Sequence, residues 1–300
     1  MSISFEDQVA IVTGAGGGLG RSHALELARR GAKVVVNDLG GAMDGTGGSS
    51  EAAEKVVSEI KELGGEAISN GGSVSDRTGA KSMVDDAMES WGRVDILINN
   101  AGILRDKSFS KIELDDFQMV VDVHLMGAVY CTHAVWPIMR EQNYGRILMT
   151  TSPTGLYGNF GQTNYGAAKA GIAGFSRSLS MEMAKYKCTV NTISPGAATR
   201  LTIDLMKAAG REVDESDWKQ GPQQIAPVIT WLCSEEANGV TNQIFHISQG
   251  NVGIMQQPAV IKSYKSDDIW SLEKLNNVMP ELMEAKKLHD IEVEKKGEPI

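Results

Sequence analysis

The strongest constraint on the fold is a regular alternation of short apolar runs with longer helical segments. Several runs carry apolar side chains without alternation, as expected of parallel strands that helices cover on both faces. The strands predicted in this way are residues 8–13, 33–37, 66–69, 94–99, 145–151, 188–194 and 243–248. The alternation predicts a doubly wound, Rossmann-type α/β fold, with a seven-stranded parallel sheet, helices on both faces and right-handed crossovers.

The chain divides into a long first part and a short second part. No change of composition interrupts residues 1–250, which is enough chain for one large core. Residues 251–300 begin with an apolar, Gln-rich stretch and continue with two expected short helices, the second opened by Pro280. We therefore expect one domain over 1–250 and a partly helical C-terminal extension over 251–300.

Charge and composition exclude several classes of partner. The 29 Lys and Arg against 38 Asp and Glu give a net charge of −9 without a basic block, so nucleic-acid binding is not expected. The longest uncharged run, 242–261, is too polar to span a membrane. The cysteines, Cys131, Cys188 and Cys233, are isolated, show no metal-ligand spacing, and favour a reducing compartment. No signal peptide precedes the first strand, so we expect a cytoplasmic protein.

A glycine-rich turn, "TGAGGGLG" at 13–20, connects the first strand to the first helix. Gly14, Gly18 and Gly20 leave room for a pyrophosphate to approach the backbone, and the N-terminus of the helix favours its negative charge. A tight turn without a ligand is the alternative. The position between a strand and a helix favours dinucleotide binding.

Asp38 ends the second strand, where a carboxylate can accept hydrogen bonds from the adenosine ribose and repel a 2′-phosphate. This favours NAD over NADP as the cofactor, although Arg21 lies nearby. The alternative is that Asp38 caps a turn, since Asp followed shortly by Gly is ordinary turn chemistry.

The stretch "SPTGLYGNFGQTNYGAAK" contains Ser152, Tyr165 and Lys169. Tyr165 and Lys169 are four residues apart on an expected helix and so face the same side. Ser152 follows the fifth strand, and in an open parallel sheet the carboxyl ends of neighbouring strands share one crevice. A phenol titrates near pH ~10, and a neighbouring ammonium would favour the phenolate. Tyr165 would then be a general acid/base, whereas the alternative is a buried Tyr beside an exposed Lys.

These motifs together with "NNAG" at 99–102 resemble the short-chain dehydrogenase/reductases over about residues 5–250. The resemblance implies that Tyr165 is the general acid/base, that Ser152 orients the substrate oxygen, and that Lys169 holds the ribose and lowers the pKa of Tyr165. It implies a single dinucleotide-binding and catalytic domain with a substrate lid near 197–218. The further cofactor-binding residues that it implies are Leu19, Val74, Asn100, Ala101, Gly102, Pro195, Gly196 and Thr199.

Two positions depart from the family pattern. His124 replaces an Asn that helps to hold a proton-relaying water, and it would either hold that water or be a core histidine. Ser73 stands before Val74 where the family commonly has Asp, which would weaken adenine binding without abolishing it.

Longer runs such as "NNAGILRD" and "GLYGNFGQTNY" are similar to the (3R)-hydroxyacyl-CoA dehydrogenase unit of the multifunctional enzyme type 2 group. The resemblance implies oxidation of a (3R)-3-hydroxyacyl-CoA with NAD. The alternative substrate is a steroid or another bulky secondary alcohol, and a scaffold without turnover is a third hypothesis. Arg105, Lys107 and Arg200 are candidates to bind CoA phosphates. The helices at 113–142 and 163–186 are expected to pair across subunits in a homodimer or homotetramer.

Overall fold

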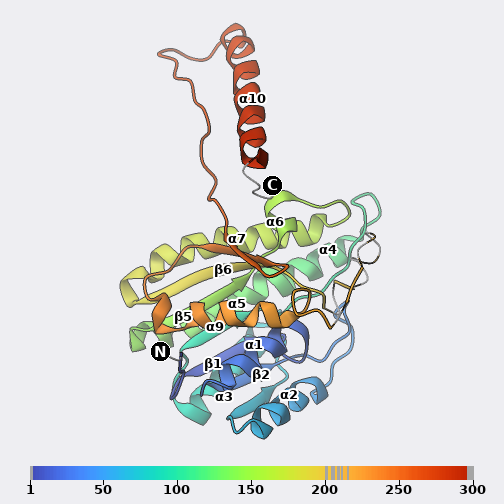
Figure 1. Cartoon of the computed structure of the whole chain (residues 1–300), viewed down its shortest axis with the longest axis vertical. Helices are drawn as coiled ribbons and strands as arrows, with labels where there is room; N and C mark the ends of the chain where they lie inside the picture. Colours follow the sequence, from blue (N-terminus) through green and yellow to red (C-terminus); the bar gives the residue numbers. More distant parts are fainter. Residues whose placement is uncertain are drawn as a thin grey trace. The chain divides into compact units, whose positions relative to one another are not determined.

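The computed structural model describes residues 3–199, 202, 203, 207, 210, 212–214 and 216–295. Contacts between Cα atoms divide the chain into two compact units, Met1–Met255 and Gln256–Ile300. Figure 1 shows the elements of both units, coloured along the sequence.

The first unit contains one sheet, which has eight strands among the described residues. They are β1 (Val9–Thr13), β2 (Lys33–Asn37), β3 (Ala67–Asn70), β4 (Ile96–Asn99), β5 (Gly145–Thr150), β6 (Cys188–Gly196), β7 (Ile244–Ser248) and β8 (Asn251–Ile254). Their order in the sheet is β3-β2-β1-β4-β5-β6-β7-β8. From β1 the chain first adds β2 and β3 on one side and then β4 and the later strands on the other side. This change of side is typical of a doubly wound sheet, as the sequence predicts.

The seven expected parallel strands, β1 to β7, are confirmed, and an eighth strand that was not expected lies at one edge. β8 pairs antiparallel with β7, with Ser248 opposite Asn251. The two residues between them, Gln249 and Gly250, have φ of 52° and 77°. Two successive left-handed residues make the tight turn that fits a β-hairpin. The chain therefore folds back beside β7 over residues 251–254, which the sequence assigns to the C-terminal extension.

Helices cover both faces of the sheet, as expected (Figure 1). Buried side chains of α1 (Gly18–Ala28), α2 (Glu51–Glu62) and α9 (Ala226–Cys233) pack on one face. Those of α3 (Arg77–Trp91), α5 (Gly127–Gln142) and α7 (Thr163–Met183) pack on the other. Other helical segments of this unit, among the described residues, are α4 (Leu114–Val121), η1 (Asp122–Met126), α6 (Pro153–Tyr157), η2 (Ala184–Tyr186), η3 (Pro222–Gln224) and η4 (Glu235–Ala237). The three cysteines are free and buried.

A π-helical segment, η1, lies between α4 and α5 and joins them into one continuous helical stretch. A π segment adds one residue to a turn and so shifts the direction of the side chains within it. His124, in the middle of η1, is 5% exposed. The segment therefore brings a titratable ring into the interior beside the ends of the central strands.

The second unit contains one helix among its described residues, α10 (Leu272–Lys295), with Pro280 inside it. The expectation of two helices separated at Pro280 was therefore wrong. Proline in a helix removes one backbone hydrogen bond but does not always end the helix. Within this unit Lys262 lies 3.5 Å from Glu281, which also bonds the hydroxyl of Tyr264. In the described part of the chain we find no helix with the length and apolar character needed to cross a bilayer.

Candidate active site

The glycine-rich turn is packed too closely for side chains at two of its glycines. A Cβ on Gly20 would lie 2.2 Å from the carbonyl oxygen of Gly14, and one on Gly14 would lie 2.7 Å from the Cα of Ala101. Gly17, the N-cap of α1, has no side-chain cap, and a Cβ there would meet no described atom within 4 Å. The N-terminus of α1 is thus accessible, and its amides fit the phosphates of a dinucleotide.

A hydroxyl group joins this turn to the "NNAG" segment. Thr13 Oγ1 accepts the backbone amides of Asn100 at 3.0 Å and Ala101 at 3.1 Å. The side-chain amide of Asn100 donates to the carbonyl oxygens of Thr13 at 2.9 Å and Gly14 at 3.1 Å. Asn100 and Thr13 therefore hold the ends of β1 and β4 together. Gly102 lies next in the chain, and a Cβ there would lie 2.2 Å from the ring of His124.

Asp38 contacts the glycine turn directly. Its Oδ2 accepts the amide of Gly16 at 2.8 Å, and its Oδ1 accepts the amide of Gly40 at 2.7 Å. The carboxylate thus acts as a turn acceptor beside the glycine-rich turn, and its binding of a ribose stays a prediction. Arg21 forms an ion pair with Glu59 of α2.

Ser152, Tyr165 and Lys169 lie together at the carboxyl end of β5. Ser152 caps α6, where its Oγ accepts the amide of Thr154 at 3.2 Å, and its hydroxyl lies near enough to Tyr165 to lower the pKa of the phenol. The ammonium nitrogen of Lys169 lies 5.5 Å from the centre of the Tyr165 ring. It donates to the carbonyl oxygen of Thr150 at 2.6 Å.

Burial changes the acid–base properties of both side chains. It raises the pKa of Tyr165 to about 12, which the Ser152 hydroxyl opposes and the charge of Asp106 reinforces. It lowers the pKa of Lys169 to about 7. Lys169 therefore loses its proton before the phenol ionises. Desolvation is the largest cause of the rise in the Tyr165 pKa. The lowering of this pKa by Lys169 stays a prediction.

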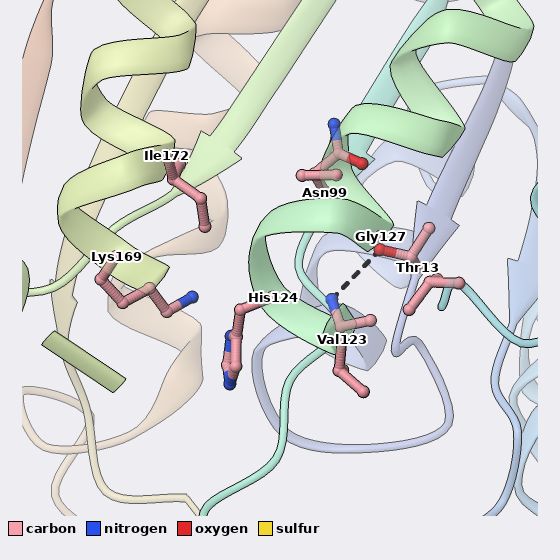
Figure 2. A pocket seen from close by; sticks show the side chains of 10 residues that line it. Thr13, Asn99, Val123, His124, Gly127, Lys169 and Ile172 are labelled. Atoms are coloured by element: carbon pink, nitrogen blue, oxygen red, sulfur yellow. Dashed lines mark hydrogen bonds between the residues drawn. The ribbon is translucent and has the colours of Figure 1, made fainter. Parts of the chain in front are cut away.

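A small polar cavity lies between Lys169 and the end of β4, and Figure 2 shows the side chains that line it. The Lys169 side chain extends from α7 toward the ring of His124. The space open to the centre of a water molecule is about 10 Å³, room for about one water. Asn99 Oδ1 and His124 Nδ1 are buried and have no hydrogen-bond partner among the described residues.

His124 is held in a defined orientation. Its Nε2 lies 2.8 Å from the carbonyl oxygen of Ile103 and 3.1 Å from the backbone nitrogen of the same residue, so it donates to the first or accepts from the second according to the tautomer. The ring stands edge-on to Tyr165, with 5.2 Å between the ring centres. Desolvation, with the charge of Lys169, holds the pKa of His124 well below 6.5. His124 is therefore neutral at physiological pH.

Comparison with known proteins agrees with this geometry. Residues 8–209 match the model of a protein family described as short chain dehydrogenase. The chain belongs to the short-chain dehydrogenase family. It is thus an oxidoreductase, and the family and fold together imply a nicotinamide dinucleotide as cofactor.

Curated relatives and solved structures extend the comparison. The chain is 46% identical over 253 residues to peroxisomal multifunctional enzyme type 2 of Mus musculus, covering 84% of this chain and 33% of that protein. A short chain dehydrogenase from Mycobacterium avium superposes with a TM-score of 0.82 at 38% identity, covering 94% of this chain and 96% of that one. The 7α-hydroxysteroid dehydrogenase complexed with NADH has a TM-score of 0.71 and 31% identity, covering 82% and 95% of the two chains. The chain spans 27% to 54% of the length of its multifunctional relatives.

The remaining expected cofactor residues lie at several places in the first unit. Thr199 lies against Gly18, whose added Cβ would be 3.6 Å from the Cβ of Thr199. Leu19 packs against the core beneath α1. Val74 is buried against Gly127, and Ser73 bonds Ser75.

Pro195 and Gly196 end β6. Gly196 is required by the sheet, since a Cβ there would lie 2.4 Å from Ser248 Oγ on β7. Of the predicted lid, 197–218, the positions 200, 201, 204–206, 208, 209, 211 and 215 lie outside the described residues, and so does the candidate cation Arg200.

The other two candidate cations are already paired. Arg105 lies 2.9 Å from Asp116 and donates to the carbonyl oxygen of Asp44 at 2.7 Å. Lys107 lies 3.2 Å from the same Asp116. A CoA phosphate would therefore have to compete with the Asp116 carboxylate for either cation.

The sequence analysis did not find Thr13, Asn99, Asn164 or the pair Asp106–Gln162. Asn164 precedes Tyr165, and its side chain accepts the Tyr165 amide at 2.8 Å and donates to the carbonyl oxygen of Arg105 at 3.0 Å. Thr13, Asn99 and Asn164 lie within or directly beside the motifs "TGAGGGLG", "NNAG" and "YGAAK", so adjacency to a motif could have pointed to them. Asp106 stands between two predicted cations, whereas Gln162 has no predicted neighbour in the sequence.

Proposed function

We propose that this protein is an NAD-dependent dehydrogenase that oxidises a (3R)-3-hydroxyacyl-CoA to the 3-ketoacyl-CoA. The single observation that carries the reaction class is the cluster of Ser152, Tyr165 and Lys169 beside the glycine turn. The acyl-CoA substrate is supported by the similarity to multifunctional enzyme type 2. The proposal takes residues 1–250 as the catalytic domain, with a lid near 197–218 and an extension over 251–300.

In this proposal the dinucleotide lies along the glycine turn. Gly14 and Gly20 keep the turn compact, and the amides at the start of α1 bind the pyrophosphate. Asp38 accepts the ribose hydroxyls and disfavours a 2′-phosphate, which makes NAD the proposed cofactor. The other proposed contacts are Leu19, Val74, Asn100, Ala101, Gly102, Pro195, Gly196 and Thr199. A bound oxidised nicotinamide would supply the acceptor for the hydride of the carbinol carbon, and a positive charge near Tyr165 before that transfer.

The side chains of the protein handle the proton. In oxidation the Tyr165 phenolate removes the proton of the substrate hydroxyl, and in reduction the phenol returns it. Ser152 donates a hydrogen bond to the reacting oxygen. Lys169 is buried beside Tyr165 and lines the same cavity as Asn99 and His124. The unpartnered Nδ1 of neutral His124 supports the interpretation that it holds a relay water rather than only filling the core.

The experiment is to follow NADH formation with a panel of substrates. It includes (3R)- and (3S)-3-hydroxyacyl-CoA esters of several lengths, hydroxysteroids and simple secondary alcohols. The proposal predicts turnover of the (3R) ester with NAD and at least about tenfold lower kcat/KM for its enantiomer. Turnover of a hydroxysteroid but no acyl-CoA would establish the alternative, which the similarity to 7α-hydroxysteroid dehydrogenase supports.

For the cell location we propose the cytoplasm, since the buried, unpaired cysteines suit a reducing compartment. The names of several relatives describe peroxisomal proteins. Fractionation of cells that express the chain at its natural level would distinguish these locations. Recovery with an organelle rather than with the cytosol would contradict the proposal.

A further inference from the structure

The segment between β2 and α2, residues 39–49, forms a compact loop that the proposed mechanism does not use. Glycine fills five of its positions. Its ends meet, because the amide of Ser49 donates to the carbonyl oxygen of Leu39 at 3.0 Å. A Cβ on Gly40 would lie 1.8 Å from the carbonyl oxygen of Ser49, so the two ends are in close contact. A surface loop whose ends meet in this way is an Ω-loop, a class that is frequently functional.

The tip of this loop is attached to the segment that follows β4. The amide of Leu104 donates to the carbonyl oxygen of Met43 at 3.0 Å. A Cβ on Gly45 would lie 3.2 Å from the side chain of Ile103, so the backbone of the loop packs directly on that residue. The tip is thus held in place although most of the loop is exposed.

Arg105 is the side chain that joins this tip to the helices of the candidate active site. Its Nε donates to the carbonyl oxygen of Asp44 at 2.7 Å, and its Nη1 donates to Asp116 of α4 at 2.9 Å. The carbonyl oxygen of Arg105 accepts the side-chain amide of Asn164 at 3.0 Å, directly before Tyr165 on α7. Asp116 thus fixes the guanidinium, which holds the tip of the loop with its remaining donor.

The loop crosses the carboxyl end of β1. It leaves the sheet at β2 and reaches the chain that follows β4, and β1 lies between these two strands. The glycine-rich turn at 13–20 follows β1, and Asp38 precedes the loop, where its Oδ1 accepts the amide of Gly40 at 2.7 Å. A dinucleotide that lies along the turn with a ribose at Asp38 is therefore bordered by the loop.

We propose that residues 39–49 are a strap over the adenosine half of the bound dinucleotide and that Arg105 is the positioning residue that keeps the strap closed. The inference rests on the place that the proposed function gives to the dinucleotide. Because the strap is attached at its tip as well as at its ends, the dinucleotide leaves when the contacts of the tip break. Arg105 then acts on the cofactor and not on the CoA phosphate that the sequence suggests for it.

The test compares Arg105→Met with the wild type. Methionine keeps an apolar stem and removes both donors. NADH bound to each protein is displaced with an excess of NAD, and its release is followed by its fluorescence in a stopped-flow instrument. Loss of a hydrogen bond from a charged group should make release about tenfold faster or more. Lys107→Met is the matched control, since the Lys107 side chain pairs with the same Asp116 and makes no bond to the strap among the described residues.

A second measurement follows the strap without cofactor or turnover. Hydrogen exchange of the Leu104 amide in the cofactor-free protein reports opening of its bond to Met43. This exchange should be faster in Arg105→Met and unchanged in Lys107→Met. Exchange of amides in the central strands should be the same in both variants, which separates release of the strap from a general loss of stability.

Faster NADH release together with faster exchange at Leu104, in Arg105→Met alone, would support the inference. Unchanged release would overturn it and leave the proposed function standing, whether or not the exchange changed. Faster release without faster exchange would also overturn it, because the strap would not have opened. Weaker acyl-CoA binding with unchanged NADH release would instead assign Arg105 to the CoA phosphates. A wild type that binds no NADH would overturn the inference together with the proposed function.

Discussion

At the scale of single residues, burial decides the order in which Tyr165 and Lys169 titrate. The Lys169 side chain is 3% exposed and donates to one carbonyl oxygen. Desolvation favours the uncharged forms of both groups, so the lysine pKa falls to about 7 and the tyrosine pKa rises to about 12. The positive charge of a bound nicotinamide would favour the phenolate that the protein alone disfavours.

This order gives a prediction for stability. Between about pH 7 and pH 9 the unfolded chain keeps a proton on Lys169 that the folded chain has lost, so the unfolded state binds more protons. The free energy of unfolding should therefore rise with pH, by about 1 kcal/mol per unit from this residue. Urea unfolding at several pH values should show this rise in the cofactor-free wild type and its absence in Lys169→Met. Equal slopes in the two proteins would contradict the prediction.

Cofactor choice is a second property that one residue should control. Asp38→Asn keeps an acceptor for Gly16 or Gly40 but loses the charge. Bonds to charged groups contribute about 1.5–3 kcal/mol, so NAD affinity should fall about tenfold or more while discrimination against NADP weakens. Calorimetric titration with both dinucleotides measures this. Unchanged preference would leave Asp38 as a turn acceptor only.

At the scale of elements, the glycine turn connects β1, α1 and the end of β4. Gly20→Ala places a methyl group 2.2 Å from the carbonyl oxygen of Gly14, so the turn has to open. We expect a stability loss of about 1–3 kcal/mol and a large loss of NAD affinity. Gly17→Ala is the matched control, since its Cβ meets no described atom and its φ of −168° suits any residue. Urea unfolding would contradict the prediction if both variants were equally stable.

The elements themselves were largely predictable because the apolar runs are long and separated. Each predicted strand lies within two residues of an observed one, for example 94–99 against β4 at Ile96–Asn99. β8 was missed because its side chains are exposed, so no burial pattern marks it. The π segment η1 was missed because a single extra residue leaves no signal in helical periodicity.

The candidate site was predictable to the extent that motifs lie next to each other in sequence. Ser152, Tyr165 and Lys169 are within eighteen residues, and the structure brings them together. The raised pKa of Tyr165 depends on its burial. The position of Asp106 depends on its contact with Gln162, which lies 56 residues further along the chain. No local pattern encodes either property.

At the scale of the whole molecule, we expect a homodimer or homotetramer formed by the helices at 113–142 and 163–186. Leu114 and Met181 expose large apolar side chains on these helices, 77% and 78% exposed. Light scattering should give two or four times the chain mass of 32.2 kDa. Met181→Glu should lower that value, whereas Leu63→Glu, at the end of α2, should not. A monomeric wild type would contradict the expectation.

The account as a whole depends on Tyr165 moving the proton of the alcohol. The most direct measurement is the rate of NADH formation by the wild type and by Tyr165→Phe at saturating (3R)-3-hydroxyacyl-CoA, with NAD affinity measured in parallel. The account predicts unchanged NAD affinity and a kcat lower by about 10²-fold or more. A Tyr165→Phe variant that binds NAD and turns over like the wild type would contradict it.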